Sequence, residues 1–257
     1  MNIKQHYHTC TKVYISQIIL IAFLLSGGIM YLETMKVHFL LKIGMICMAS
    51  MILLFFVGKY IYFIRRYSSV QSCLSKPRAD GMEETEYVIL FEPSPTLKLK
   101  LFGKDGLCHY YLMDKHTKWW SWLFPPPLQA WCRASYLVKK RDGQDVSEIH
   151  VNPRKLEIMT IVNRLKTEMH CIENKRHLCV FGFNQTEKIK IVKETGRYHF
   201  YLNDHKIAEL TKGWMSTSLQ KIFPLNTQML SFHEKVNQEE RVLVFALLTG
   251  LWSNKKN

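Results

Sequence analysis

The sequence has few of the residue patterns that are typical of enzymes or metal proteins. It contains no G-x-S-x-G, P-loop, G-x-G-x-x-G or H-E-x-x-H motif, and His233-Glu234 is not followed by a second histidine at the required spacing. Its seven cysteines are odd in number and none is spaced C-x-x-C, which indicates free thiols in a reducing compartment. We therefore expect a non-catalytic protein with no metal and no other cofactor.

One group of cysteines and histidines has residue types that can bind a metal ion: His170, Cys171, His177 and Cys179. A hairpin would bring some of these side chains together. Neighbours on a strand point to opposite faces, however, so His170 and Cys171 cannot easily share one metal ion. We interpret the four as ordinary strand residues.

Acidic residues are also scarce. The 21 Asp and Glu are outnumbered by 35 Lys and Arg, which gives a net charge of +14. Such a balance favours an anionic partner: a membrane surface, a phosphorylated ligand or nucleic acid. The sequence carries no helix-turn-helix, zinc-finger or RNA-binding signature, so we expect no nucleic-acid partner.

Two long apolar runs lie near the N-terminus. Residues 13–32 hold no charge, and residues 43–58 are uncharged before Lys59 and a short apolar continuation. Runs of this length predict membrane-spanning helices. The first run lacks a small-x-small cleavage site and a second span follows closely, so a cleaved signal peptide is disfavoured. We predict a two-span hairpin over residues 1–66.

The charges that flank these runs predict the orientation of the chain. The loop between the runs offers few cations, whereas basic residues lie on the outer ends of both runs: Lys4, Lys12, Lys59, Arg65, Arg66, Lys76 and Arg78. The positive-inside rule then places both termini in the cytoplasm of a multi-pass cell-membrane protein.

The rest of the chain has the spacing of an all-β fold. Residues 67–84 are polar, with Pro77 and Gly81, and indicate a linker before a domain at 85–257. Turn signals at 103–106, 142–143 and 203–204 separate short alternating runs. The predicted strands are residues 86–91, 97–102, 107–113, 134–140, 156–162, 165–172, 177–183, 188–193, 197–202, 206–210 and 229–232.

The last apolar stretch predicts a helix. Asn237 and Glu240 have capping-box spacing, and the residues after Arg241 are apolar on every side of a helix up to Trp252. With about 11 apolar residues it has roughly half the ~20 needed to cross a bilayer. We expect this helix to be buried at the centre of a closed barrel formed by about 12 strands.

Some predicted strands alternate cations with apolar residues, so one face of each would be cationic. We assign anionic-lipid binding to seven residues in these strands and in one hairpin: Lys98, Lys100, Lys139, Lys140, Arg141, Lys188 and Lys190. The alternative is an ordinary solvated barrel exterior, which always carries charge.

Two further patterns leave alternatives open. The Trp-rich segment at 119–131 either packs in the core or contacts lipid headgroups. Residues 106–114 match residues 196–204 in Gly, His, Tyr, Leu and Asp at a constant offset of 90, which suggests an internal duplication or a chance match.

The order and spacing of these parts resemble the tubby C-terminal-like superfamily, which includes phospholipid scramblases and LURP-one-related proteins. The resemblance rests on the turn at 103–106, the strand at 196–204 and the helix at 239–252, and it covers residues 85–255. It is nearest to bacterial tubby-like proteins that place this domain after membrane spans. It implies a 12-stranded barrel around a central helix and, by analogy with eukaryotic tubby proteins, phosphoinositide binding through basic residues.

We therefore predict a membrane-anchored binding or signalling module that recognises anionic lipid or a protein partner at the inner leaflet. The alternative is a phospholipid-handling, scramblase-like protein. That alternative would need an acidic or polar path through the membrane. The two spans offer only Ser16, Gln17 and Ser50 for such a path, so the alternative is disfavoured.

Overall fold

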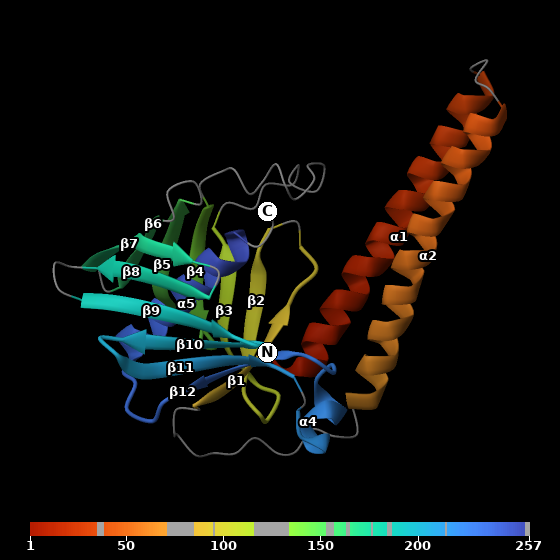
Figure 1. The fold of residues 1–257 in the computed structure, drawn as a ribbon. Helices are drawn as coiled ribbons and strands as arrows, with labels where there is room; N and C mark the ends of the chain where they lie inside the picture. Colours follow the sequence, from red (N-terminus) through yellow and green to blue (C-terminus); the bar gives the residue numbers. More distant parts are fainter. Residues whose placement is uncertain are drawn as a thin grey trace. The chain divides into compact units, whose positions relative to one another are not determined.

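The computed structural model describes residues 1–34, 39–70, 85–94, 96–115, 134–152, 157–162, 165–175, 177–183, 187–213 and 215–254. The chain divides into a helical unit, Asn2–Leu74, and a β unit, Ser75–Asn257. Met1 is grouped with the β unit. Figure 1 shows the elements of both units.

The helical unit is a hairpin of two helices, α1 (Ile3–Thr34) and α2 (Phe39–Val70), of 32 residues each. Both are long and apolar enough to cross a membrane, as predicted. At 1.5 Å per residue each is about 48 Å long, which exceeds the ~30 Å hydrocarbon core of a bilayer. Helix α2 continues four residues beyond the boundary predicted at residue 66.

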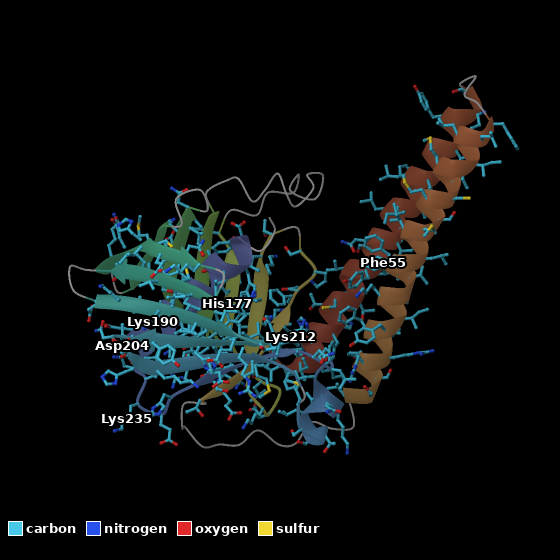
Figure 2. The ribbon with its side chains drawn as sticks, in the orientation of Figure 1. Phe55, His177, Lys190, Asp204, Lys212 and Lys235 are labelled. Carbon is cyan, nitrogen blue, oxygen red and sulfur yellow. The ribbon has the colours of Figure 1, made fainter. Side chains whose placement is uncertain are left out.

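Aromatic side chains pack the two helices together. The rings of Tyr14 and Phe63 stack with centroids 5.3 Å apart, and Tyr7 lies 6.1 Å from the same Phe63 ring. Most other large apolar side chains stand away from the hairpin, with 74% of Phe23 and 72% of Met51 exposed (Figure 2). Within the described part of this unit, residues 2–34 and 39–70, nothing covers that apolar surface.

The β unit is a closed antiparallel barrel. Within the described residues twelve strands follow one another around it in chain order, and β12 pairs with β1 to close the ring. The predicted barrel is therefore confirmed. The strands are β1 (Glu86–Phe91), β2 (Lys98–Phe102), β3 (Cys108–Asp114), β4 (Ala134–Lys140), β5 (Asp145–Asn152), β6 (Glu157–Val162), β7 (Leu165–Lys175), β8 (Leu178–Phe183), β9 (Glu187–Glu194), β10 (Arg197–Leu202), β11 (His205–Lys212) and β12 (Gln228–Phe232).

The predicted turns are present and explain several strand ends. Gly106 and Gly143 have φ of 77° and 87°, in the left-handed region where glycine carries no Cβ penalty. Asn203 and Asp204, with φ of 47° and 67°, form the β10–β11 turn. Two consecutive positive φ values are typical of a type I′ hairpin turn.

Two elements were missed by the strand pattern. Strand β5 has a register shift against β4, and Val146 and Ser147 are both buried there, which breaks strict alternation. Helix α4 (Thr217–Ile222) has only six residues, too few for a helical period to show.

The duplication hypothesis for the two matching segments stays a prediction. They form β3 and β10, and because every neighbouring pair is antiparallel, an odd- and an even-numbered strand run in opposite directions. His109 lies beside a register shift, whereas His199 pairs regularly with Val192 and Glu209.

Helix α5 (Gln238–Asn254) begins with the predicted capping box. The Glu240 N–H donates to Asn237 Oδ1, and the Asn237 N–H donates to Glu240 Oε2, both at 2.9 Å. This satisfies donors that a helix start otherwise leaves unpaired.

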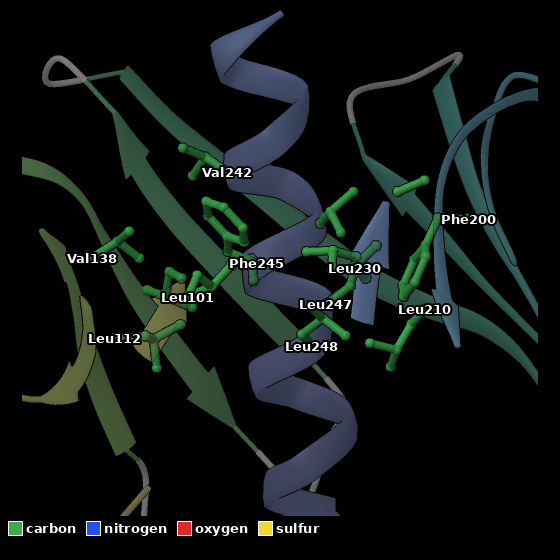
Figure 3. Close-up of a cluster of buried hydrophobic side chains, with 14 of the residues drawn as sticks. Leu101, Leu112, Val138, Phe200, Leu210, Leu230, Val242, Phe245, Leu247 and Leu248 are labelled. Atoms are coloured by element: carbon green, nitrogen blue, oxygen red, sulfur yellow. The ribbon is translucent and has the colours of Figure 1, made fainter. Parts of the chain in front are cut away.

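The middle of α5 is buried on every side. Residues 244–249 are at most 2% exposed, and residues 244–248 belong to one apolar cluster that contains residues from all twelve strands. In Figure 3, Phe245 points toward Leu101, Leu112 and Val138, while Leu230, Leu210 and Phe200 lie on the opposite side of the helix. A Cβ on Gly250 would come within 2.6 Å of Ile158 Cδ1, so α5 approaches β6 closely at this residue.

Candidate functional site

The first group of predicted lipid-binding cations lies on β2 and β4. Lys100 is opposite Tyr111 of β3, which is in turn opposite Lys139 of β4, so the three side chains form one row across neighbouring strands. Leu99 and Leu101, on the other face of β2, are buried in the core. The predicted separation of cationic and apolar faces therefore holds for this strand.

Burial and ion pairing limit what this row can bind. Lys100 Nζ lies 3.2 Å from Glu92 Oε2, and only 8% of its side chain is exposed. Lys139 Nζ lies 3.2 Å from Asp145 Oδ1, with 33% of its side chain exposed. A carboxylate already neutralises each of these two cations, whereas Lys98 at the start of β2 has no ion pair with any described residue.

Lys140 and Arg141 lie at the turn between β4 and β5. Lys140 Nζ donates a hydrogen bond of 3.4 Å to Gln238 Oε1, in the first turn of α5, and Arg141 is exposed. No described carboxylate pairs with either side chain. These two cations therefore mark the end of the barrel at which α5 begins.

The second group, Lys188 and Lys190, lies on β9. Lys188 is exposed, and its backbone N–H donates to Asn203 Oδ1 at 3.0 Å. Lys190 Nζ lies 3.3 Å from Asp204 Oδ1 (Figure 2). Ile189 and Ile191, between and beyond them, are buried in the core.

The seven predicted residues do not form one surface. Strands β5 to β8 separate β9 from β4 on one side, and β10, β11, β12 and β1 separate it from β2 on the other. The barrel thus carries two separate cationic surfaces. Within the described chain the members without an ion pair are Lys98, Lys140, Arg141 and Lys188.

A buried arginine was not predicted. Arg241 is 3% exposed, and its Nη1 donates to the Tyr87 hydroxyl at 3.1 Å. Its guanidinium carbon lies 5.2 Å from the centre of the Phe232 ring, a cation–π distance. The sequence signal that could have indicated this residue was a single cation next to the apolar run of the last helix. Arg241 therefore links α5 to β1 through the hydrogen bond and to β12 through the cation–π contact.

A histidine between two carboxylates was also missed. His199 is 8% exposed, with Nε2 3.3 Å from Glu194 Oε2 and Nδ1 3.6 Å from Glu209 Oε2. The hydrogen bond from Lys206 lowers the pKa of Glu209. The match between residues 106–114 and 196–204 drew attention to His199 but gave no signal of its acidic neighbours.

Three of the four residues His170, Cys171, His177 and Cys179 lie in strands β7 and β8, whereas His177 was predicted to lie in a strand but is in the turn before β8. Cys171 and Cys179 pack against the core, whereas 58% of the His170 side chain is exposed. Among the described residues no three His, Cys, Asp or Glu side chains form a metal-binding group.

Other predicted features lie outside the described residues. These are the Trp-rich segment at 119–131 and the cations Lys76 and Arg78. The choice between core packing and lipid contact for the Trp-rich segment therefore stays open.

Comparison of the chain with protein-family models, with curated proteins and with solved structures gave no match. Any function must therefore be argued from the residues and the geometry described above.

Proposed function

We propose that this protein is a membrane-anchored, non-catalytic module whose barrel recognises anionic lipid or a protein partner at the cytoplasmic face. The observation that carries the proposal is a hairpin with exposed apolar side chains joined to a cationic β-barrel. Residues 65–257 contain 30 Lys and Arg and 20 Asp and Glu, a net charge of +10. A well-placed cation near an anionic leaflet contributes about 1 kcal/mol of attraction.

The proposal includes a tubby-like barrel. A closed ring of twelve antiparallel strands, with a C-terminal helix that shares a core with every strand, is the architecture that this resemblance implies. The resemblance supports a binding role rather than a catalytic one. The residues that would bind lipid are the exposed cations of this chain that have no described carboxylate partner.

Exposure and pairing favour the surface at the β4–β5 turn. Arg141 is exposed, Lys140 is adjacent, and neither has a described carboxylate partner. Lys188 on β9 is the main alternative. That surface is weaker, because the neighbouring Lys190 is partly neutralised by Asp204. Lys100 contributes least, since it is buried against Glu92.

Vesicle sedimentation of residues 70–257 tests the proposal. We expect binding to vesicles that contain anionic lipid and none to neutral vesicles, with binding lost as salt shortens the Debye length below ~10 Å. The Lys140→Gln/Arg141→Gln variant should weaken binding more than Lys188→Gln/Lys190→Gln, which removes the same charge from the other surface. A folded domain that ignores anionic vesicles at low salt would exclude lipid and leave a protein partner.

The orientation of the hairpin needs its own test. With both termini in the cytoplasm, a membrane-impermeant thiol reagent applied to intact cells should label a Thr34→Cys variant and should not label Cys73. Labelling of Cys73 from outside would reverse the proposed topology.

A further inference from the structure

Two cysteines lie side by side in the β7–β8 hairpin. Cys171 Sγ is 3.9 Å from Cys179 Sγ, and both side chains are partly buried against the core cluster. Neither takes part in the proposed lipid contact. Both face inward, so they lie on the face of the hairpin opposite to the exposed His170 side chain.

The backbone of the hairpin explains why the two sulfur atoms meet. Cys171 is opposite Phe181, and Glu173 is opposite Val180, so Ile172 is an extra residue on β7. A bulge of this kind bends its strand and re-aims the side chains beside it. Ile172 itself is 62% exposed, and its Cδ1 would lie 2.8 Å from a Cβ on Gly182, so a side chain on Gly182 would displace Ile172.

The set of neighbouring ligands favours sulfur–sulfur bonding over metal binding. Burial, followed by the effect of Cys171, raises the pKa of Cys179 to about 12, so the thiol form dominates at neutral pH. The thiolate is the form that binds metal ions and also the form that attacks a disulfide, so this shift slows both reactions. No third His, Cys, Asp or Glu ligand joins the pair within the described chain.

We propose that Cys171 and Cys179 form a reversible disulfide that staples the β7–β8 hairpin under oxidising conditions. The sulfur atoms must approach by roughly 2 Å to reach the ~2.05 Å bond length. Cytosolic disulfides, where present, are usually transient or redox-sensing.

The reaction is a thiol–disulfide exchange with a low-molecular-weight disulfide. One protein thiol loses its proton and attacks the small disulfide, which forms a mixed disulfide and releases one small thiolate. The second protein thiol loses its proton and displaces the other small thiolate. Both small thiolates take up the protons, so two protein thiols are oxidised and one small disulfide is reduced to two thiols.

Peptide mapping of the full-length protein in detergent tests the proposal. The reduced chain is equilibrated with increasing ratios of oxidised to reduced glutathione, alkylated and cut after Lys and Arg. Cleavage at Lys175 and Arg176 separates peptide 167–175 from peptide 177–188. We expect one linked species, lighter than the two free peptides by two hydrogens, which disappears on addition of a reducing thiol.

Variants and hydrogen exchange complete the experiment. Cys171→Ser should abolish the linked species and leave glutathione attached to Cys179, whereas Cys108→Ser, on β3, should leave it unchanged. In the oxidised wild type, amide exchange at the ends of β7 and β8 should slow by about tenfold or more, because the disulfide opposes opening of the hairpin. The proposal is wrong if the two peptides stay separate while other cysteines carry glutathione, or if Cys171 pairs with a different cysteine.

Discussion

Two kinds of apolar helix occur in this chain, and they differ in what covers them. The hairpin helices α1 and α2 expose most of their large side chains, including 74% of Phe23. Helix α5 is equally free of a polar stripe in its middle, yet Phe245 and Leu248 are 2% exposed. Both hairpin helices have 32 residues and α5 has 17.

The N-terminal capping hydrogen bonds do not distinguish the two kinds of apolar helix. Helix α1 begins with the same reciprocal device as α5: the Gln5 N–H donates to Asn2 Oδ1 at 2.9 Å, and the Asn2 N–H donates to Gln5 Oε1 at 3.0 Å. Length and surroundings make the difference, because an apolar helix too short for a bilayer must be covered by protein. We propose that lipid covers the hairpin surface instead.

The largest effect is expected from a charge in the middle of α5. Phe245→Asp would place an unpaired carboxylate among buried apolar side chains, at a cost of several kcal/mol, comparable with the whole stability of a domain. Chemical unfolding of residues 70–257, followed by circular dichroism, should show loss of the cooperative transition. Glu239→Gln in the exposed first turn is the control and should melt nearly as the wild type does. An unchanged transition in Phe245→Asp would show that the strands do not close around this helix.

A charge in the hairpin should act through the membrane and not through the barrel. Leu24 is 62% exposed in α1, and Leu225, before β12, is 60% exposed. Leu24→Arg should disfavour membrane insertion by about 3 kcal/mol, whereas an exposed surface substitution such as Leu225→Arg should stay within about 0.5 kcal/mol. The measurement is the fraction of full-length protein that resists alkaline extraction from membranes. Equal extraction of the two variants would contradict a lipid-covered α1.

The fold could be predicted from the sequence where local chemistry decides it. The capping box at Asn237, the left-handed turns and most strands follow from residues close together in the chain. Strand β5 could not be predicted in the same way, because a register shift against β4 places Val146 and Ser147 both in buried positions. The pattern of buried residues in β5 therefore depends on its pairing with β4.

The candidate site was less predictable, because pairing across strands decides which cations are available. Lys98 and Lys100 have the same alternating pattern, yet Glu92 lies 3.2 Å from Lys100 Nζ and Lys98 has no described partner. The distance of β9 from β2 and β4 follows from the order of strands in the closed ring. A sequence pattern along one strand predicts neither the ion pair between Lys100 and Glu92 nor the order of strands in the ring.

A smaller effect is expected at the contact that fastens α5 to β1. Tyr87→Phe removes the hydroxyl that accepts the hydrogen bond from Arg241, and hydrogen bonds to charged groups contribute about 1.5–3 kcal/mol. We expect the free energy of unfolding of residues 70–257 to fall by about 2 kcal/mol. Tyr136→Phe is the matched control, because Tyr136 is also in the core and its hydroxyl makes no hydrogen bond to a described residue. Equal losses in the two variants would assign the effect to packing.

The smallest effect concerns the capping boxes, and it separates the two units. Asn237→Ala removes the acceptor for the Glu240 N–H and should lower the free energy of unfolding of the barrel by about 1 kcal/mol. Asn237→Ser should restore most of that loss, since serine is also a good N-cap. Asn2→Ala removes the same acceptor from α1, which belongs to the helical unit, so barrel unfolding in the full-length protein should not change. Denaturant titration followed by the near-ultraviolet signal of the barrel aromatics measures all three variants. A loss in Asn2→Ala as large as that in Asn237→Ala would mean that the two units unfold together, and the contrast between a lipid-covered and a protein-covered helix would then not extend to their stability.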